Sequence, residues 1–187
     1  MKEITKHNIV YTCIIYTPIG AATVSAVDDA LTGLWFMGQK YYPSNVDVWV
    51  NDPDYPIFKR LRAWLSEYFS GINNPSDLRL EPQGTVFQKA VWNILLKIPY
   101  GQVATYGEIA KTIAIACNLP SMSAQAIGGA VGHNPISILI PCHRVVGSNR
   151  SLTGYAGGLD KKEYLLRLEN INLQQANLDE LSLQVCE

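Results

Sequence analysis

The chain has 187 residues, which is enough for one large domain or two small ones with a substantial core. Apolar residues make up 48% of it and charged residues 17%, and this balance excludes an intrinsically disordered chain. No apolar run is long enough to cross a bilayer, and the opening residues, Met1-Lys2-Glu3, lack the apolar stretch of a secretion signal. We therefore expect a soluble, cytoplasmic protein that contacts no membrane.

The net charge of −1 conceals an uneven distribution along the chain. Residues 84–150 carry five lysines and arginines against a single glutamate, whereas the segments on either side are acidic. A basic segment inside a neutral protein is typical of a local contact with a polyanion such as nucleic acid. Chance clustering of charged residues on a solvated surface explains this charge distribution equally well.

The first third of the chain predicts a small sheet and one helix. Residues 10–17, 22–27 and 31–37 are rich in β-branched and aromatic side chains and are separated by turn signals. Large apolar residues recur at helical spacing over residues 57–69. Residues 72–84 contain Asn-Asn-Pro-Ser and Pro-Gln-Gly and are the best candidate for a linker, so we place the domain boundary after residue 83.

Beyond the linker the periodicity is helical. Two helix starts are marked by capping-box pairs, Thr85 with Gln88 and Thr105 with Glu108. The second pair puts Tyr106 on the first turn of its helix, and a third helix is predicted over residues 122–132. Two short helices joined by a tight turn resemble a helix-turn-helix, although such pairs more often serve plain core packing.

The third helix has one face without bulky side chains. The small residues are Ala124, Ala126, Gly128, Gly129 and Ala130. Each glycine costs about 1 kcal/mol of helix propensity relative to alanine, so another surface must approach this backbone closely. That surface is either a nucleic acid or a neighbouring helix of the same protein.

An apolar run over residues 136–140 leads into Pro141-Cys142-His143-Arg144. A cysteine among aliphatic residues is normally inert because burial raises the pKa of its thiol, but a histidine and an arginine oppose that shift here. The imidazole needs a third group to orient it, and Glu169, which ends a helical stretch at 161–168, is the candidate. On spacing alone, an inert buried cysteine is the more common alternative.

A metal site is not predicted. The four cysteines form no Cys-x-x-Cys and do not space with the three histidines as zinc ligands, and a disulfide framework is not expected either. Five aspartates lie in turn-like stretches and are interpreted as solvated loop charges: Asp28, Asp29, Asp47, Asp52 and Asp54.

The segment Pro141-Cys-His-Arg-Val145 resembles the active-site signature of the 6-O-alkylguanine-DNA alkyltransferases, the methylated-DNA–protein-cysteine methyltransferases. Other stretches match this family in order and spacing from about residue 9 to residue 170. They are Thr17-Pro-Ile-Gly20, Glu67-Tyr-Phe-x-Gly71, Gly84-Thr-x-Phe-Gln-x-x-Val-Trp92, Ile98-Pro-Tyr-Gly-Gln-Val103, Tyr106-Gly-Glu-Ile-Ala110, Gly128-Gly-Ala130, Asn134-Pro135, Gly154-Tyr-x-Gly-Gly158 and Lys162-Glu163.

The resemblance implies an α+β protein. A small N-terminal α/β domain of ribonuclease-H-like arrangement would cover residues 1–83. A mostly helical winged helix-turn-helix domain that binds DNA and accepts the alkyl group would cover residues 84–170. Residues 171–187 would form an accessory tail.

The resemblance also implies DNA repair by direct damage reversal without a cofactor. A monomer would bind alkylated double-stranded DNA in the minor groove, flip the lesion out, and move the alkyl group from O6 of guanine irreversibly to Cys142, once per molecule. The chemistry would involve Cys142, His143, Glu169, Asn134 and Tyr106. Tyr155, Ala156, Gly157 and Val145 would form the guanine pocket, with the carbonyls of Cys142 and Val145 accepting the exocyclic amine. Tyr106, Gln125, Ala126, Gly129 and Ala130 would contact DNA, and Arg144 would be structural.

One position departs from the family pattern. Gln125 stands where family members commonly place an arginine that fills the gap left by the flipped base, so we predict weaker DNA binding or slower repair. The alternative function is a non-transferring alkyl-lesion sensor or helix-turn-helix DNA-binding protein, which the presence of Cys142 disfavours. A cysteine hydrolase is a third class, but the sequence shows no clear oxyanion hole for it.

Overall fold

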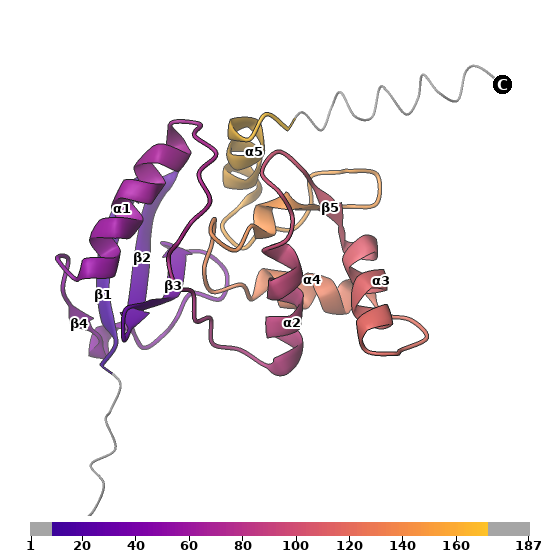
Figure 1. The fold of residues 1–187 in the computed structure, drawn as a ribbon, viewed down its shortest axis with the longest axis horizontal. Helices are drawn as coiled ribbons and strands as arrows, with labels where there is room; N and C mark the ends of the chain where they lie inside the picture. The colour runs from indigo at the N-terminus through magenta and orange to yellow at the C-terminus, as the bar shows by residue number, and fades with distance from the viewer. Residues whose placement is uncertain (1–8, 172–187) are drawn as a thin grey trace, which may run out of the picture.

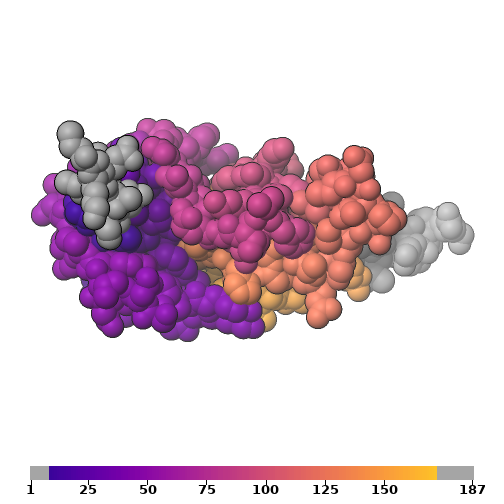
Figure 2. Space-filling view, turned by 90° about the horizontal axis from the view of Figure 1, so that it is seen from below, coloured from indigo at the N-terminus to yellow at the C-terminus, as the bar shows by residue number. Residues whose placement is uncertain are grey.

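The computed structural model describes residues 9–171, in which an N-terminal sheet with one helix lies beside a mostly helical C-terminal part (Figure 1). This arrangement confirms the expected α+β class. The molecule is elongated, and the residues near 105–125 lie at the end away from the N-terminal sheet (Figure 2). Of the predicted tail at 171–187, all but the first residue lies outside the described residues, and so does His7.

The N-terminal sheet has the strand order β3-β2-β1-β4. Its strands are β1 (Tyr11–Thr17), β2 (Gly20–Val27), β3 (Ala30–Phe36) and β4 (Val50–Asn51). The first three are antiparallel, and β4 runs parallel to β1 after a short 3-10 helix, η1 (Val46–Val48). Asp28 and Asp29 have φ of 47° and 59°, the left-handed conformation of a tight hairpin turn that aspartate tolerates well.

Helix α1 (Pro56–Phe69) runs along the sheet (Figure 1). Proline at its first position is preorganised for helix, because its φ is already helical and its missing N–H needs no partner there. The buried residues recur at helical spacing and form one apolar face: Ile57, Phe58, Leu61, Leu65 and Tyr68. The chain leaves the helix through Gly71, whose φ of 81° favours glycine.

The C-terminal part contains the helices α2 (Val86–Leu95), α3 (Tyr106–Ala116), α4 (Ala124–Gly132) and α5 (Leu159–Leu168). Both predicted capping boxes are present, with reciprocal bonds at the starts of α2 and α3. The predicted start of α4 at residue 122 was two residues early, because Ser123 is the N-cap and its side chain accepts from the Gln125 N–H. Strands β5 (Ala104–Thr105) and β6 (Val145–Val146) pair in parallel beside these helices.

The outer edge of β3, on the side away from β2, connects the two parts. At one end the Leu31 N–H donates to the Arg79 carbonyl at 2.8 Å, so part of the predicted linker lies along the sheet. At the other end the Leu34 N–H donates to the Pro135 carbonyl at 2.8 Å, and the Ser137 N–H donates to the Leu34 carbonyl at 3.0 Å. The sheet therefore holds the segment that leads to residues 141–144. Within residues 9–171, no helix combines the length and apolarity needed to span a membrane.

Candidate active site

The predicted apolar run delivers Cys142 into the core. Residues 136–140 are all buried, and the run ends in the 3-10 helix η2 (Cys142–Arg144). Ile138 has a φ of 70°, a conformation that a β-branched side chain rarely adopts and that costs about 1–3 kcal/mol. The surrounding backbone bonds, including Ile140 N–H to the Ile136 carbonyl at 3.0 Å, hold this tight loop in place.

Cys142 is 5% exposed, and one side-chain donor, the amide of Asn134, lies within hydrogen-bond distance of its sulfur. Burial raises the pKa of this thiol, and the side-chain amide of Asn134 and the charge of Lys162 oppose that rise. Asn134 Nδ2 lies 3.0 Å from Cys142 Sγ. Burial therefore disfavours the thiolate, while the Asn134 amide and the Lys162 charge stabilise it.

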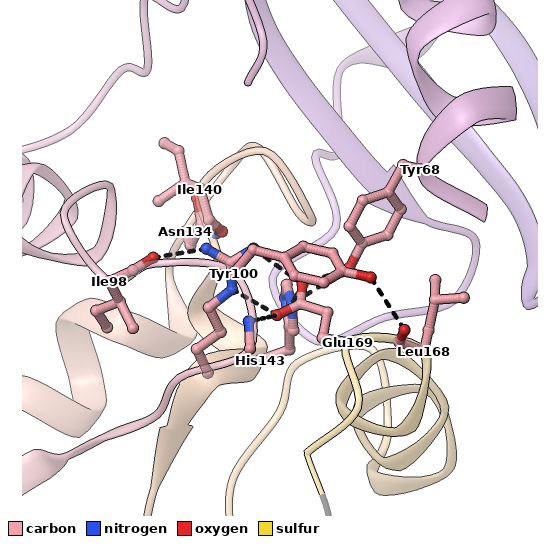
Figure 3. A network of polar contacts seen from close by, with 10 residues as sticks. Tyr68, Ile98, Tyr100, Asn134, Ile140, His143, Leu168 and Glu169 are labelled. Atoms are coloured by element: carbon pink, nitrogen blue, oxygen red, sulfur yellow. Dashed lines mark hydrogen bonds and ion pairs between the residues drawn. The ribbon is translucent and has the colours of Figure 1, made fainter. Parts of the chain in front are cut away.

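Asn134 also organises the loop around the cysteine. Its Nδ2 donates to the carbonyl of Ile140, which lies beside it in Figure 3, at 2.8 Å. Its Oδ1 accepts from the Ile136 N–H at 3.0 Å. The amide is buried, so each of these bonds satisfies a backbone group that water cannot reach. One side chain thus ties the end of α4 to the turn that carries the thiol.

The imidazole of His143 is fully buried, and its Nε2 lies 2.9 Å from Glu169 Oε1. Burial lowers the pKa of His143, while the hydrogen bond and charge of Glu169 oppose that shift. A buried neutral imidazole that donates from Nε2 has its lone pair on Nδ1, which has no hydrogen-bond partner among the described residues. The Nδ1 lone pair of His143 is therefore free to accept a proton.

Glu169 follows the last residue of α5 and is an ionised, buried carboxylate. Burial would raise its pKa, but hydrogen bonds from His143 and Arg144 bring the pKa to about 2. Arg144 donates to both carboxylate oxygens, at 2.8 Å and 2.9 Å, and to the Ile98 carbonyl at 2.6 Å. These contacts agree with the structural role expected for Arg144.

The segment from Gly154 to Gly158 lies near the thiol. Burial raises the pKa of both tyrosine hydroxyls that face Cys142, those of Tyr106 and Tyr155, and the Cys142 charge raises each further. Tyr106 donates to the Gly154 carbonyl at 3.3 Å. At Gly157 a Cβ would lie 2.9 Å from the Tyr155 ring and 3.1 Å from the Phe36 ring, so only glycine fits there.

In two further members of the predicted pocket, Ala156 and Val145, the backbone carbonyl already accepts a hydrogen bond. The Ala156 carbonyl accepts from the Lys40 N–H at 3.0 Å. The Val145 carbonyl accepts from Lys162 Nζ at 2.5 Å, and the Cys142 carbonyl accepts from the Val145 N–H. Each carbonyl expected to bind the exocyclic amine therefore has only its second lone pair free.

Lys162 is a site residue that the sequence reasoning used only as part of a motif. Its fully buried ammonium donates to the carbonyls of Val145, Thr153 and Gly154, and burial lowers its pKa to about 8. It shares one face of α5 with the buried Leu165 and Leu166, at spacings of three and four residues. A lysine in helical register with two buried leucines indicates that the lysine is buried too, so the sequence did contain a signal for this residue.

The predicted DNA-contacting residues of α4 do not all lie on one surface. Gln125, Ala126 and Gly129 are exposed, and a Cβ at Gly129 would meet no atom within 4 Å. Ala130 departs from the prediction because its side chain is 4% exposed and packs in the core, where its carbonyl accepts from Trp92 Nε1 at 2.9 Å. It belongs to the inward face with Ile127 and Val131.

Among the described residues there is no cluster of three or more histidine, cysteine or acidic side chains that could hold a metal ion. Of the cysteines resolved there, Cys13 and Cys142 are buried and Cys117 is exposed, and none forms a disulfide.

Two protein-family models match this chain. The ribonuclease-like domain of 6-O-methylguanine DNA methyltransferase matches residues 9–82, and the DNA binding domain of 6-O-methylguanine DNA methyltransferase matches residues 86–171. A methylated-DNA–protein-cysteine methyltransferase of Haemophilus influenzae is 41% identical over 165 residues, which cover 86% of this chain and 88% of that protein. The Methanosarcina acetivorans protein of the same name is 43% identical over 159 residues, or 85% of this chain and 97% of that one.

Solved structures show the same similarity. The crystal structure of Mycobacterium tuberculosis O6-methylguanine methyltransferase has a TM-score of 0.74 and 42% identity, covering 86% of this chain and 93% of that one. The structure of Mycobacterium tuberculosis OGT in complex with DNA has a TM-score of 0.74 and 41% identity, with 86% and 91% covered. These similarities include both parts of the fold.

Proposed function

The chain belongs to the 6-O-methylguanine DNA methyltransferase family, and on that premise we propose that Cys142 is the residue that accepts the alkyl group. The activity is that of a methylated-DNA–protein-cysteine methyltransferase: it repairs DNA by direct reversal, moving an alkyl group from the damaged base to a cysteine of the protein. The observation that carries the assignment is the 3.0 Å contact between Asn134 Nδ2 and Cys142 Sγ, beside the His143–Glu169 pair.

In the transfer step the sulfur of Cys142 attacks the alkyl carbon, a carbon–sulfur bond forms, and the bond from that carbon to O6 of guanine breaks. The thiol proton passes to Nδ1 of His143 through a bridging water, and Glu169 stabilises the resulting imidazolium. The guanine takes a proton from Tyr106 as it leaves, and the proton held by His143 then passes through water to the Tyr106 phenolate, which restores both side chains. Asn134 and Lys162 stabilise the negative charge that develops on sulfur.

The product is a thioether, which has no low-energy leaving group. Hydrolysis would need an activated water aimed at the carbon, and the only base assigned here, His143, is held by Glu169 for the thiol proton. We therefore expect each molecule to act once, with a stoichiometry of one alkyl group per chain.

The DNA contact is assigned to α3 and α4, as a monomer on the minor groove of duplex DNA. The support is the exposed edge of α4 at Ala126 and Gly129, where small side chains let a helix lie close to sugar and phosphate. A lesion inside the base stack is out of reach of a buried thiol, so the nucleotide must flip out at a cost of a few kcal/mol. Tyr106 is the first residue of α3 and in this assignment crowds the backbone phosphate.

Gln125 is exposed at the start of α4, where it can reach the space left by the flipped base. It can hydrogen-bond an orphaned cytosine, but it is shorter than arginine and carries no charge. Gln125→Arg should therefore raise both DNA affinity and repair rate. Unchanged values for both would contradict this role.

The function is tested by intact mass spectrometry after mixing the protein with a duplex that contains O6-methylguanine. The expected result is one methyl group per chain, mapped to Cys142 and lost in Cys142→Ala. Cys117→Ala is the matched control because it removes the exposed thiol. This variant should still take up one methyl group, and its uptake would fall only if exposure, rather than the built site, decided reactivity. An unlabelled wild type that still binds the lesion would identify a sensor, and many repaired lesions per chain would exclude a stoichiometric acceptor.

A further inference from the structure

Glu169 is enclosed by donors from both parts of the fold (Figure 3). His143 donates to Oε1 at 2.9 Å, and Arg144 donates to the two carboxylate oxygens at 2.8 Å and 2.9 Å. Tyr68 donates its hydroxyl to Oε1 at 2.7 Å, across a separation of 101 residues. Tyr68 lies in α1 of the N-terminal part, so this bond joins that part directly to the proposed base.

The ring of Tyr68 is fixed by aromatic neighbours. The side chain is 3% exposed, the Trp64 ring stacks on it at 5.3 Å between centroids, and the Tyr100 ring meets it edge-on at 6.3 Å. A buried ring held on two sides cannot swing its hydroxyl away from Glu169 without repacking its surroundings. The bond is therefore a fixed feature of the fold.

The Tyr68 hydroxyl acts as a permanent donor. Burial raises its pKa, and the adjacent Glu169 charge raises it further, so the hydroxyl stays protonated. Its oxygen also lies 3.4 Å from His143 Nε2, which places two oxygens beside that nitrogen. Both oxygens favour a proton on Nε2 and leave the lone pair on Nδ1.

We propose that Tyr68 is a positioning residue for alkyl transfer: it holds the carboxylate of Glu169 and, through it, the orientation and tautomer of His143. The N-terminal part is then a component of the reaction site as well as a folding partner. This inference rests on the proposed function, in which His143 receives the thiol proton.

The effect on pH dependence follows from the charges around the imidazole. The groups that face His143 are Glu169, Arg144, Lys162 and the Tyr68 hydroxyl. Removing the hydroxyl takes one donor from Glu169 Oε1, so the carboxylate attracts an imidazolium more strongly. The pKa of His143 then rises, and the acidic limb of the transfer rate should move to higher pH.

The test is Tyr68→Phe, which removes the hydroxyl and keeps the ring between Trp64 and Tyr100. Single-turnover transfer is measured at saturating protein over a range of pH, together with DNA affinity and thermal unfolding. We expect transfer to slow about tenfold, as is typical when a partner that orients a reactive side chain is lost. The acidic limb should shift to higher pH, while DNA affinity stays at the wild-type value.

Tyr42→Phe is the matched control, because it removes another tyrosine hydroxyl of the N-terminal part, one that pairs with Thr23 Oγ1 at 2.5 Å. It should leave the rate and the pH profile unchanged. A wild-type rate and profile in Tyr68→Phe would show that Arg144 alone positions Glu169, and equal slowing in both variants would show a general packing effect; either overturns the inference. Failure of the proposed function is distinct, because the wild type itself would then carry no methyl group.

Discussion

The side-chain amide of Asn134 lies 3.0 Å from the sulfur of Cys142 and bonds the backbone on both sides of the loop that carries it. One residue therefore both hydrogen-bonds the thiol and holds its loop together. Burial raises the pKa of the thiol, and the hydrogen bond from the Asn134 amide is the largest effect that lowers it. Asn134 therefore couples the chemistry of the thiol to the folding of its loop.

Asn134→Asp keeps the shape and the oxygen that accepts from the Ile136 N–H, and it removes the donor to sulfur together with the bond to the Ile140 carbonyl. An ionised aspartate would also oppose a neighbouring thiolate. We expect transfer to slow by about a hundredfold, the scale of losing one preorganised donor to developing negative charge. The measurements are single-turnover transfer and titration of the thiolate by its ultraviolet absorbance, in a background where serine replaces the other three cysteines, Cys13, Cys117 and Cys186. An unchanged thiol titration would contradict the assignment.

Much of this site follows from local sequence rules. The two capping boxes, the turn at Asp28 and Asp29, and the cysteine–histidine pair after an apolar run are all short-range patterns, and the structure contains them. The inward position of Ala130 also has a local signal, since it falls in helical register with Ile127 and Val131. That signal was overlooked because Ala130 is also one of the small residues of α4, and a run of small residues is equally typical of a helix face that contacts DNA.

The contacts that the sequence did not predict are long-range. Tyr68 meets Glu169 because α1 packs beside α5 across the domain boundary, and no spacing rule links residues 101 positions apart. The edge of β3 pairs with residues 79–81 and 135–137 through backbone atoms, which carry no side-chain signal. Sequence reasoning could therefore supply the reactive residues, whereas their relative placement depends on tertiary packing.

Acid should destabilise this protein through its buried pair. Glu169 has a folded pKa of about 2 against an ordinary value of 4.5, so its stabilising contribution is complete above about pH 4.5 and is lost as pH falls toward 2. That shift corresponds to about 3 kcal/mol. The pKa of His143 is lowered from 6.5, so the unfolded chain binds a proton before the folded one does, and stability already declines as pH falls below 6.5.

Urea unfolding of the wild type and Glu169→Gln at a series of pH values checks this expectation. The variant should be less stable at neutral pH and should lose less stability between pH 4.5 and pH 2 than the wild type does. Parallel curves for the two proteins would show that Glu169 does not carry the acid sensitivity.

Lys162→Met should weaken both the fold and the thiol. The substitution keeps an unbranched side chain but leaves the carbonyls of Val145, Thr153 and Gly154 without their shared donor. Buried acceptors that lose a partner cost about 1–3 kcal/mol each, so we expect a loss of several kcal/mol in unfolding free energy. Removal of the cation should also raise the pKa of Cys142.

Lys161→Met is the matched control, because its ammonium lies in a salt bridge with the exposed Asp160 rather than in the core. Thermal unfolding and the rate of methyl transfer should be close to wild type in that variant and clearly reduced in Lys162→Met. Equal behaviour of the two variants would mean that the buried ammonium neither supports residues 153–154 nor acts on the thiol.

Gly129→Ala separates folding from DNA binding on α4. A Cβ at this position meets no atom of the protein within 4 Å, and the backbone is helical, so alanine should stabilise the free protein by up to about 1 kcal/mol. If the same Cβ points at a closely approaching DNA backbone, the affinity for methylated duplex should fall by about fivefold, or roughly 1 kcal/mol. Thermal unfolding and DNA titration at fixed salt measure the two effects, with Ser66→Ala on the exposed side of α1 as the control for helix propensity. A variant that is more stable and binds DNA as well as the wild type would place this edge of α4 away from the nucleic acid.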